Sequence, residues 1–84
     1  MKKIKFSDHA LEQMQERGAS RLEVEESVRK GEQSPAKYGR TAFRYNFQFN
    51  AIWAGKKSAI KQVMSIVVEE NNEYIVVTVY TFCF

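Results

Sequence analysis

Residues Ser7 to Gly18 read S-D-H-A-L-E-Q-M-Q-E-R-G and give the strongest local signal in the chain. The Ser7 hydroxyl can accept a hydrogen bond from the first helical turn, where the helix dipole also favours the negative charge of Asp8. Gly18 can adopt the left-handed conformation that ends a helix, and Arg17 places a positive charge in the last turn. The stretch therefore predicts a helix from Asp8 to Arg17.

The same stretch holds the only histidine of the chain, His9. At about 100° per residue, one side of the helix is an apolar stripe of Ala10, Leu11 and Met14. Polar residues border this stripe at intervals of four, namely His9, Gln13 and Arg17. The positive end of the helix dipole favours a neutral imidazole that can accept a proton. His9 is thus a candidate catalytic residue, and the alternative is a partly exposed histidine that only packs beside its neighbours.

A short strand and a second helix flank this first helix. Lys2 to Phe6 alternates lysine with apolar side chains, which predicts an edge strand. Ser20 and Glu23 form a capping box, in which each side chain can bond the other residue's backbone N–H. The second helix is expected to run to Lys30 and to end at Gly31.

The apolar period changes from 3.6 residues to two at Thr41, after a connection over Glu32 to Gly39 that holds the only proline. Aromatic residues then alternate with polar ones, which predicts a strand with one buried face and one polar face. The polar face consists of Arg44, Asn46, Gln48 and Asn50. Ala51 to Ala54 either continues this strand or begins a short separate one.

Two further strands are expected over residues 59–69 and from Tyr74 to Phe84. The turn E-E-N-N-E joins them, because asparagine tolerates a positive φ. Apolar residues on both faces of the last strand indicate a central strand that is buried on both sides. The fold class is therefore α+β, with two N-terminal helices on one face of a three- to four-stranded antiparallel sheet. We expect residues 1–84 to form a single domain, because a chain of 84 residues supports one small core.

Positive charge is concentrated in the middle of the chain. Residues 1–32 hold seven basic and seven acidic side chains, residues 33–68 hold six basic and no acidic ones, and residues 69–84 hold three acidic and no basic ones. Such a block suits phosphates or an acidic protein partner, and the alternative is an ordinary solvated surface. The block consists of Lys37, Arg40, Arg44, Lys56, Lys57 and Lys61.

The composition argues against several kinds of site. A single cysteine allows no internal disulfide, and the chain has no glycine-rich phosphate loop, no second histidine and no cysteine cluster. We therefore expect neither a metal nor another cofactor. No apolar run approaches the length of a membrane span, so a cytoplasmic location without membrane contact is expected.

The remaining side chains suffice to cleave RNA without a metal. A base removes the 2′-OH proton, cations stabilise the phosphorane, and an acid protonates the leaving 5′ oxygen. We assign His9 as the base or acid, and we assign Arg17, Arg44 and Lys61 to phosphate binding or to the transition state. Further RNA contacts are expected from Lys37, Arg40, Asn46, Gln48 and Tyr80.

Strand alternation predicts where these residues gather. Lys61 and Ser65 of the second long strand are expected to join Arg44 on one face, together with Thr78 and Tyr80 of the third, provided that the register aligns them. Tyr80 could then stack on a base. The alternatives are ordinary outward-facing charges and, for Thr78 and Tyr80, packing within the sheet.

The sequence resembles an uncharacterised bacterial domain family that opens with S-x-H-A-L-x-x-M-x-x-R-G and ends in a strand like I-V-V-T-V-Y. The matching residues are Ser7, His9, Ala10, Leu11, Met14, Arg17, Gly18 and Ile75 to Tyr80. That family looks like a relative of the BrnT toxins and, more distantly, of the RelE and ParE toxins. These are small basic proteins of bacterial toxin–antitoxin pairs, and many of them cleave RNA. The chain departs from its relatives at Gln13, where many carry arginine.

The resemblance implies a β-α-α-β-β-β order, which agrees with the order read from the residues. It also implies a metal-independent endoribonuclease of toxin type, which would act on RNA such as ribosome-bound messenger and pair with a small antitoxin protein. The first alternative is a non-catalytic binding module, either a ParE-like inhibitor of a protein target or a nucleic-acid-binding partner. The second is a degenerate domain whose basic face only docks an acidic antitoxin. A homodimer is left open.

Overall fold

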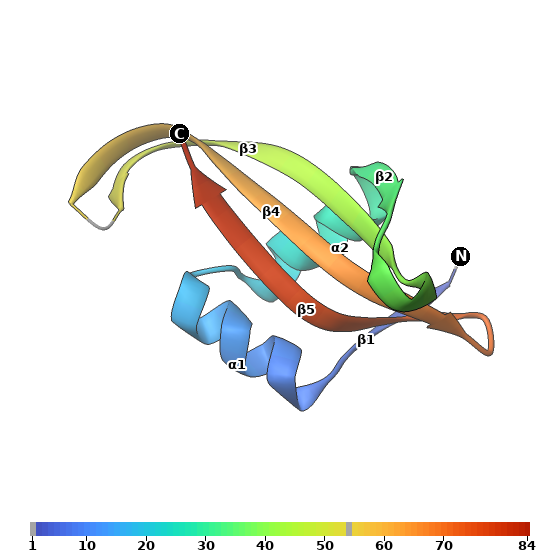
Figure 1. The fold of residues 1–84 in the computed structure, drawn as a ribbon. Coiled ribbons are helices and arrows are strands. Elements are labelled where there is room, and N and C mark those ends of the chain that lie inside the picture. The colour runs from blue at the N-terminus through green and yellow to red at the C-terminus, as the bar shows by residue number, and fades with distance from the viewer. Residues whose placement is uncertain (1, 54) are drawn as a thin grey trace.

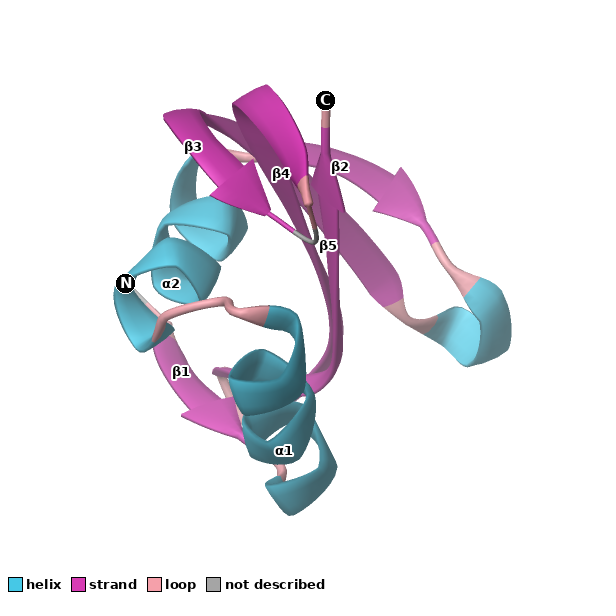
Figure 2. Cartoon of the chain, turned by 90° about the vertical axis from the view of Figure 1, so that its left-hand side faces the viewer, coloured by secondary structure: helices cyan, strands magenta, loops and turns pink. Residues whose placement is uncertain are grey.

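The structure, a computed structural model, describes residues 2–53 and 55–84, apart from the side chains of residues 49–53, 56 and 58. Within these residues the elements follow in the order β1 (Lys3–Phe6), α1 (Asp8–Arg17), α2 (Arg21–Lys30), β2 (Glu32–Pro35), the 3-10 turn η1 (Lys37–Gly39), β3 (Thr41–Trp53), β4 (Lys56–Glu70) and β5 (Glu73–Cys83). The expected α+β class is confirmed, and both helices lie on the same side of the sheet (Figures 1 and 2).

Both predicted helices are confirmed, and their capping residues explain why. The Ser7 hydroxyl accepts from the Ala10 N–H at 3.1 Å, and Gly18 is left-handed with φ 71° and ψ 31°. The capping box of α2 is complete, since Ser20 N–H donates to Glu23 Oε1 at 2.9 Å and Glu23 N–H donates to Ser20 Oγ at 3.1 Å. No helix of the described residues is long and apolar enough to cross a bilayer.

Gly31 ends α2 as expected, but for a different reason. Its backbone is extended, with φ −74° and ψ 163°, so it does not need the left-handed conformation. A Cβ placed there would lie 2.3 Å from the Ser27 carbonyl oxygen and 2.8 Å from that of Arg44. Glycine therefore allows the end of α2 to approach β3 closely.

The predicted apolar stripe of α1 is confirmed at Ala10 and Met14 and is wrong at Leu11, which is 43% exposed. In α2, Leu22 is 70% exposed. The buried residues are Ala10, Gln13 and Met14 of α1 and Val24, Ser27 and Val28 of α2. The apolar side chains of this set pack onto the sheet, where they meet Phe43, Val63, Val67, Val76 and Val79.

The sheet order is β1-β5-β4-β3-β2, and the predicted antiparallel sheet of three or four strands is wrong in two respects. β1 pairs with β5 in parallel, because the chain crosses over through both helices before it returns to the sheet. β2 pairs with β3 where a connection was expected. The sequence E-Q-S-P of β2 has no apolar alternation, so only its pairing makes it a strand.

Two hairpins build the long strands, and each contains a one-residue shift of register. β3 continues to Trp53, which was one of the two alternatives, and its pairing with β4 shifts between Gln48 and Ala51. The pairing of β4 with β5 shifts between Ile66 and Val67. The second hairpin turns at two asparagines with positive φ, as predicted.

β5 is not the doubly buried central strand that we expected. β4 occupies the middle of the sheet, and the helices cover only one face of β5. On that face Val76 and Val79 are fully buried, whereas Tyr80 and Phe82 are 38% and 41% exposed. The apolar residues on the other face of β5 are therefore not covered by α1 or α2.

Candidate nucleic-acid interface

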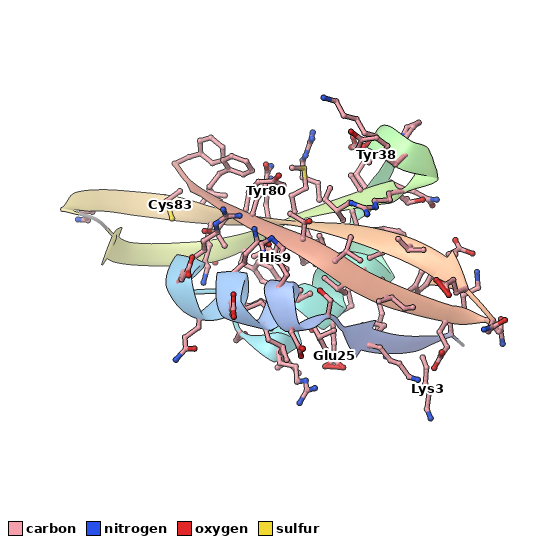
Figure 3. All side chains as sticks on the ribbon, turned by 60° about the horizontal axis from the view of Figure 1, so that its bottom comes forward. Lys3, His9, Glu25, Tyr38, Tyr80 and Cys83 are labelled. Carbon is pink, nitrogen blue, oxygen red and sulfur yellow. The ribbon has the colours of Figure 1, made fainter. Side chains whose placement is uncertain are left out.

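The sheet surface turned away from α1 and α2 is the main candidate site, and we call it the open face. The strand register aligns its side chains in rows across β3, β4 and β5. Figure 3 shows Tyr80 and Tyr38 on the side of the sheet opposite to Glu25 of α2. The open face consists of Arg44, Asn46, Gln48, Ile60, Gln62, Met64, Ile66, Thr78, Tyr80 and Phe82.

Two adjacent rows form the centre of the open face. One row runs from Arg44 through Met64 to Tyr80, and Arg44 Nη2 lies 3.3 Å from Met64 Sδ. The other contains Gln62, whose Nε2 donates to Asn46 Oδ1 at 2.9 Å, and ends at Phe82.

The rings of Tyr80 and Phe82 are stacked, with centroids 6.4 Å apart and an interplanar angle of 22°. Both rings are partly exposed. Expectations for Arg44, Asn46, Gln48 and Tyr80 on one face are confirmed, whereas the side chain of Asn50 lies outside the described residues.

Lys61 and Ser65 do not join Arg44, so this part of the prediction is wrong. Both point toward the helices and are buried, with Lys61 only 6% exposed. The Lys61 ammonium donates to the Gly18 carbonyl oxygen and, at 2.9 Å, to Glu23 Oε1. The Ser65 hydroxyl lies 2.7 Å from that of Ser27.

The register shift in the first hairpin explains the error. At its tip Trp53 pairs with Lys56, and the same register continued inward would pair Arg44 with Ser65. The shift between Gln48 and Ala51 pairs Arg44 with Met64 instead. A one-residue slip exchanges the two faces of a strand, so it moves every side chain of the inner part of β4 to the opposite side.

The Lys61–Glu23 pair joins the centre of the sheet to the connection between the helices. Partial burial disfavours the charged Glu23 carboxylate, but the Ser20 N–H and the Lys61 ammonium outweigh this effect, so the pKa of Glu23 is lowered from its ordinary value of 4.5. With its ammonium bonded to the Gly18 carbonyl and to Glu23, Lys61 stabilises the fold and does not reach the open face.

Polar side chains of α1 bond the backbone of β5 beyond the residues that pair with β1. β1 pairs with β5 only as far as Val76. Beyond it, Gln13 Oε1 accepts from the Val79 N–H at 2.9 Å, and Arg17 Nη1 donates to the Val79 carbonyl at 2.6 Å. An arginine has no acceptor for that N–H, so the Gln13 amide has a specific use here.

Arg17 links the helix side of the molecule to the open face. Its Cζ lies 5.0 Å from the centroid of the Tyr80 ring, which is a cation–π contact. Its backbone carbonyl accepts from the Thr81 hydroxyl at 2.9 Å. His9 is exposed in the first turn of α1, two turns before Arg17, and its catalytic role stays a prediction.

The turn η1 borders the open face beside Tyr80. The Ala36 N–H donates to the Arg40 carbonyl at 2.9 Å and closes the turn. Lys37 and Arg40, two of the predicted RNA-binding residues, therefore flank Tyr38, which is 88% exposed and whose ring centroid lies 5.8 Å from Arg40 Cζ. Sequence reasoning missed Tyr38, although an aromatic residue within K-Y-G-R is a recognisable signal.

The open face is mainly uncharged or positive. Residues 33–68 and 74–84 contain no aspartate or glutamate. Glu32 of β2 stands opposite Arg44 and Glu70 stands at the end of β4, so carboxylates lie at the borders. Among the described residues, no three histidine, cysteine, aspartate or glutamate side chains gather closely enough to hold a metal ion.

Comparison with known protein families identifies a match that spans most of the chain. The profile of a family described as a domain of unknown function, DUF4258, matches residues 6–81. Searches of the curated proteins and of the solved structures found no match. The likeness to BrnT, RelE and ParE toxins therefore stays a prediction.

Proposed function

The chain belongs to the DUF4258 family of domains of unknown function, and we propose that it binds single-stranded RNA on the open face of its sheet. The observation that carries the proposal is the exposed Tyr80–Phe82 pair with the Arg17 guanidinium above Tyr80. Exposed aromatic rings on an uncovered sheet are the platform on which unpaired bases stack.

The surroundings of the rings suit a nucleic-acid strand. Lys37 and Arg40 of the η1 region and Arg44 of β3 supply positive charge for phosphates. Asn46 and Gln62 supply amide groups that can bond base edges or the 2′-OH. Successive phosphates of one strand can each contact one of these basic side chains. An apolar protein surface offers no anion for them to bind.

The first experiment is fluorescence anisotropy with a labelled 12-nucleotide RNA without secondary structure. Replacing a stacking ring removes about 1–3 kcal/mol per base, so Tyr80→Ala and Phe82→Ala should each weaken binding about tenfold. Leu22→Ala is the matched control, because Leu22 is an exposed apolar residue on the helix side. Its affinity should equal that of the unmodified chain.

Two results would contradict the proposal. The unmodified chain could fail to bind the RNA at low salt, or Leu22→Ala could weaken binding as much as Tyr80→Ala does. DNA of the same sequence is measured in parallel. Equal affinity for DNA would broaden the proposed ligand from RNA to single-stranded nucleic acid in general.

Metal-independent RNA cleavage is the stronger form of this proposal. The observation that favours it is the row on α1, in which exposed His9 precedes Arg17, whose guanidinium reaches Tyr80. Lys61 is left out of this form because it is buried on the opposite face. Cleavage of the same RNA in EDTA by the unmodified chain, and its loss in His9→Ala, would support a nuclease. Pairing with a small antitoxin and self-association stay predictions.

A further inference from the structure

A pocket of about 290 Å³ lies where the η1 region meets the open face. Ile66 of β4 and Thr78 and Tyr80 of β5 line it from the sheet, while residues of the turn line it from the other side. The turn contributes Ala36, Lys37, Tyr38 and Arg40. This volume is at the small end for ligand sites and suits a single planar group of a larger ligand.

Tyr38 is the unusual residue of this pocket. Its φ of 62° and ψ of 35° place it in the left-handed region, which a bulky side chain rarely adopts. Asparagine or glycine would adopt this conformation at lower cost, and Gly39 next to it is also left-handed. Because Tyr38 is 88% exposed, packing of its ring in the core does not offset the strain of this backbone conformation. A strained residue with an exposed ring is typical of a ligand-binding position.

The chemistry of the lining fits one nucleotide. Two aromatic residues, Tyr38 and Tyr80, come from opposite sides of the pocket, and Ile66 adds an apolar wall. The Thr78 hydroxyl can donate to or accept from a base edge. Lys37 and Arg40 supply the charge that a phosphate next to the base requires.

We infer that this pocket holds one base of the bound RNA, and that it prefers a purine because the larger ring system stacks over more area. The inference rests on the proposed RNA binding and adds a specific subsite to it. Tyr80 would belong to both the subsite and the stacking platform, whereas Tyr38 would belong to the subsite alone.

The test compares 12-nucleotide oligo(A) and oligo(U) by anisotropy, together with thermal unfolding. The unmodified chain should bind oligo(A) several times more tightly than oligo(U). In Tyr38→Asn the affinity for oligo(A) should fall about fivefold and the preference should disappear, while the melting temperature stays equal or rises. Ile66→Trp, which fills the pocket from the sheet, should also remove the preference, and Leu22→Ala should change neither quantity.

The outcomes separate this inference from the proposed function. Failure of the unmodified chain to bind either RNA would overturn both. Binding that Tyr80→Ala weakens but Tyr38→Asn leaves unchanged would overturn only the subsite, as would an unmodified chain without a preference for oligo(A). A fall in melting temperature in Tyr38→Asn, with the preference retained, would assign Tyr38 to the fold.

Discussion

The two faces of the sheet are built from the same three long strands, yet they differ in the burial and in the bonding partners of their side chains. On the helix side, Lys61 and Ser65 are buried and bonded to partners from the helical region. On the open face, Tyr80 and Phe82 are exposed, and Arg44 with Met64 and Gln62 with Asn46 bond across the sheet surface. The polar groups of the helix side are therefore bonded within the protein, whereas the rings of the open face are accessible to a ligand.

The difference shows that residue type alone does not identify a functional side chain. Lys61 and Arg44 both looked like phosphate ligands in the sequence. The structure gives Lys61 the Gly18 carbonyl and the Glu23 carboxylate as partners, whereas it leaves Arg44 exposed at the surface. A cation that is already bonded inside the protein stabilises the fold, and an exposed one can bind a ligand.

The largest effect that separates the faces is expected from Lys61→Met. The change leaves the Glu23 carboxylate and the Gly18 carbonyl without the ammonium, so the free energy of unfolding should fall by about 2–3 kcal/mol in urea titrations. Lys30→Met removes an exposed ion pair with Glu26 and should change it by less than about 0.5 kcal/mol. Weaker RNA binding by Lys61→Met at unchanged stability would contradict this division between the faces.

A smaller loss of stability is expected at the edge where α1 meets β5. In Gln13→Met the Val79 N–H loses its acceptor, which should reduce the free energy of unfolding by about 1–2 kcal/mol and speed amide exchange at Val79. Gln13→Glu retains an acceptor oxygen at the same position and is the control. Slow exchange at Val79 in Gln13→Met would show that another group protects this edge.

The pH dependence of stability should reveal the Lys61–Glu23 pair. Because the pKa of Glu23 is lowered in the folded state, its contribution is complete above the ordinary value of 4.5 and is lost as the pH falls through the folded value. The stability difference between the unmodified chain and Glu23→Gln should therefore be larger at pH 7 than at pH 3. An equal stability difference at pH 7 and pH 3 would contradict a lowered pKa of Glu23.

The smallest effect concerns the border of the open face. Glu32 stands opposite Arg44, so its carboxylate offsets part of the positive charge. Glu32→Gln should strengthen RNA binding about twofold at low salt, and the gain should vanish at high salt. An unchanged or lower affinity at low salt would mean that the strand does not pass near Arg44.

The sequence allowed the helices to be predicted because their ends depend on neighbouring residues. Ser7 caps the start of α1 and Gly18 caps its end, and the Ser20–Glu23 capping box lies at the start of α2. β2 could not be predicted, since its four residues have no apolar pattern and form a strand only through pairing. The parallel pairing of β1 likewise depends on the path of the chain through the helices.

The site was predicted only in part, because the pairing of β4 has a register shift on both sides, one with β3 and one with β5. The first exchanges the faces of β4 relative to β3, and the second exchanges those of β5 relative to β4. The two cancel between β3 and β5, so Arg44 and Tyr80 were placed together correctly. β4 alone is reversed, so Lys61 was misplaced and Gln62 was missed. A bulge depends on cross-strand packing, which alternation within one strand does not contain.

The most direct test of RNA binding on the open face is photo-crosslinking of a 4-thiouridine-labelled 12-nucleotide RNA, followed by mass spectrometry of the crosslinked peptides. The account predicts crosslinks to Tyr80, Phe82 and the η1 region, which high salt and unlabelled RNA both reduce. Crosslinks confined to α2, where Leu22 and Glu26 are found, would contradict it.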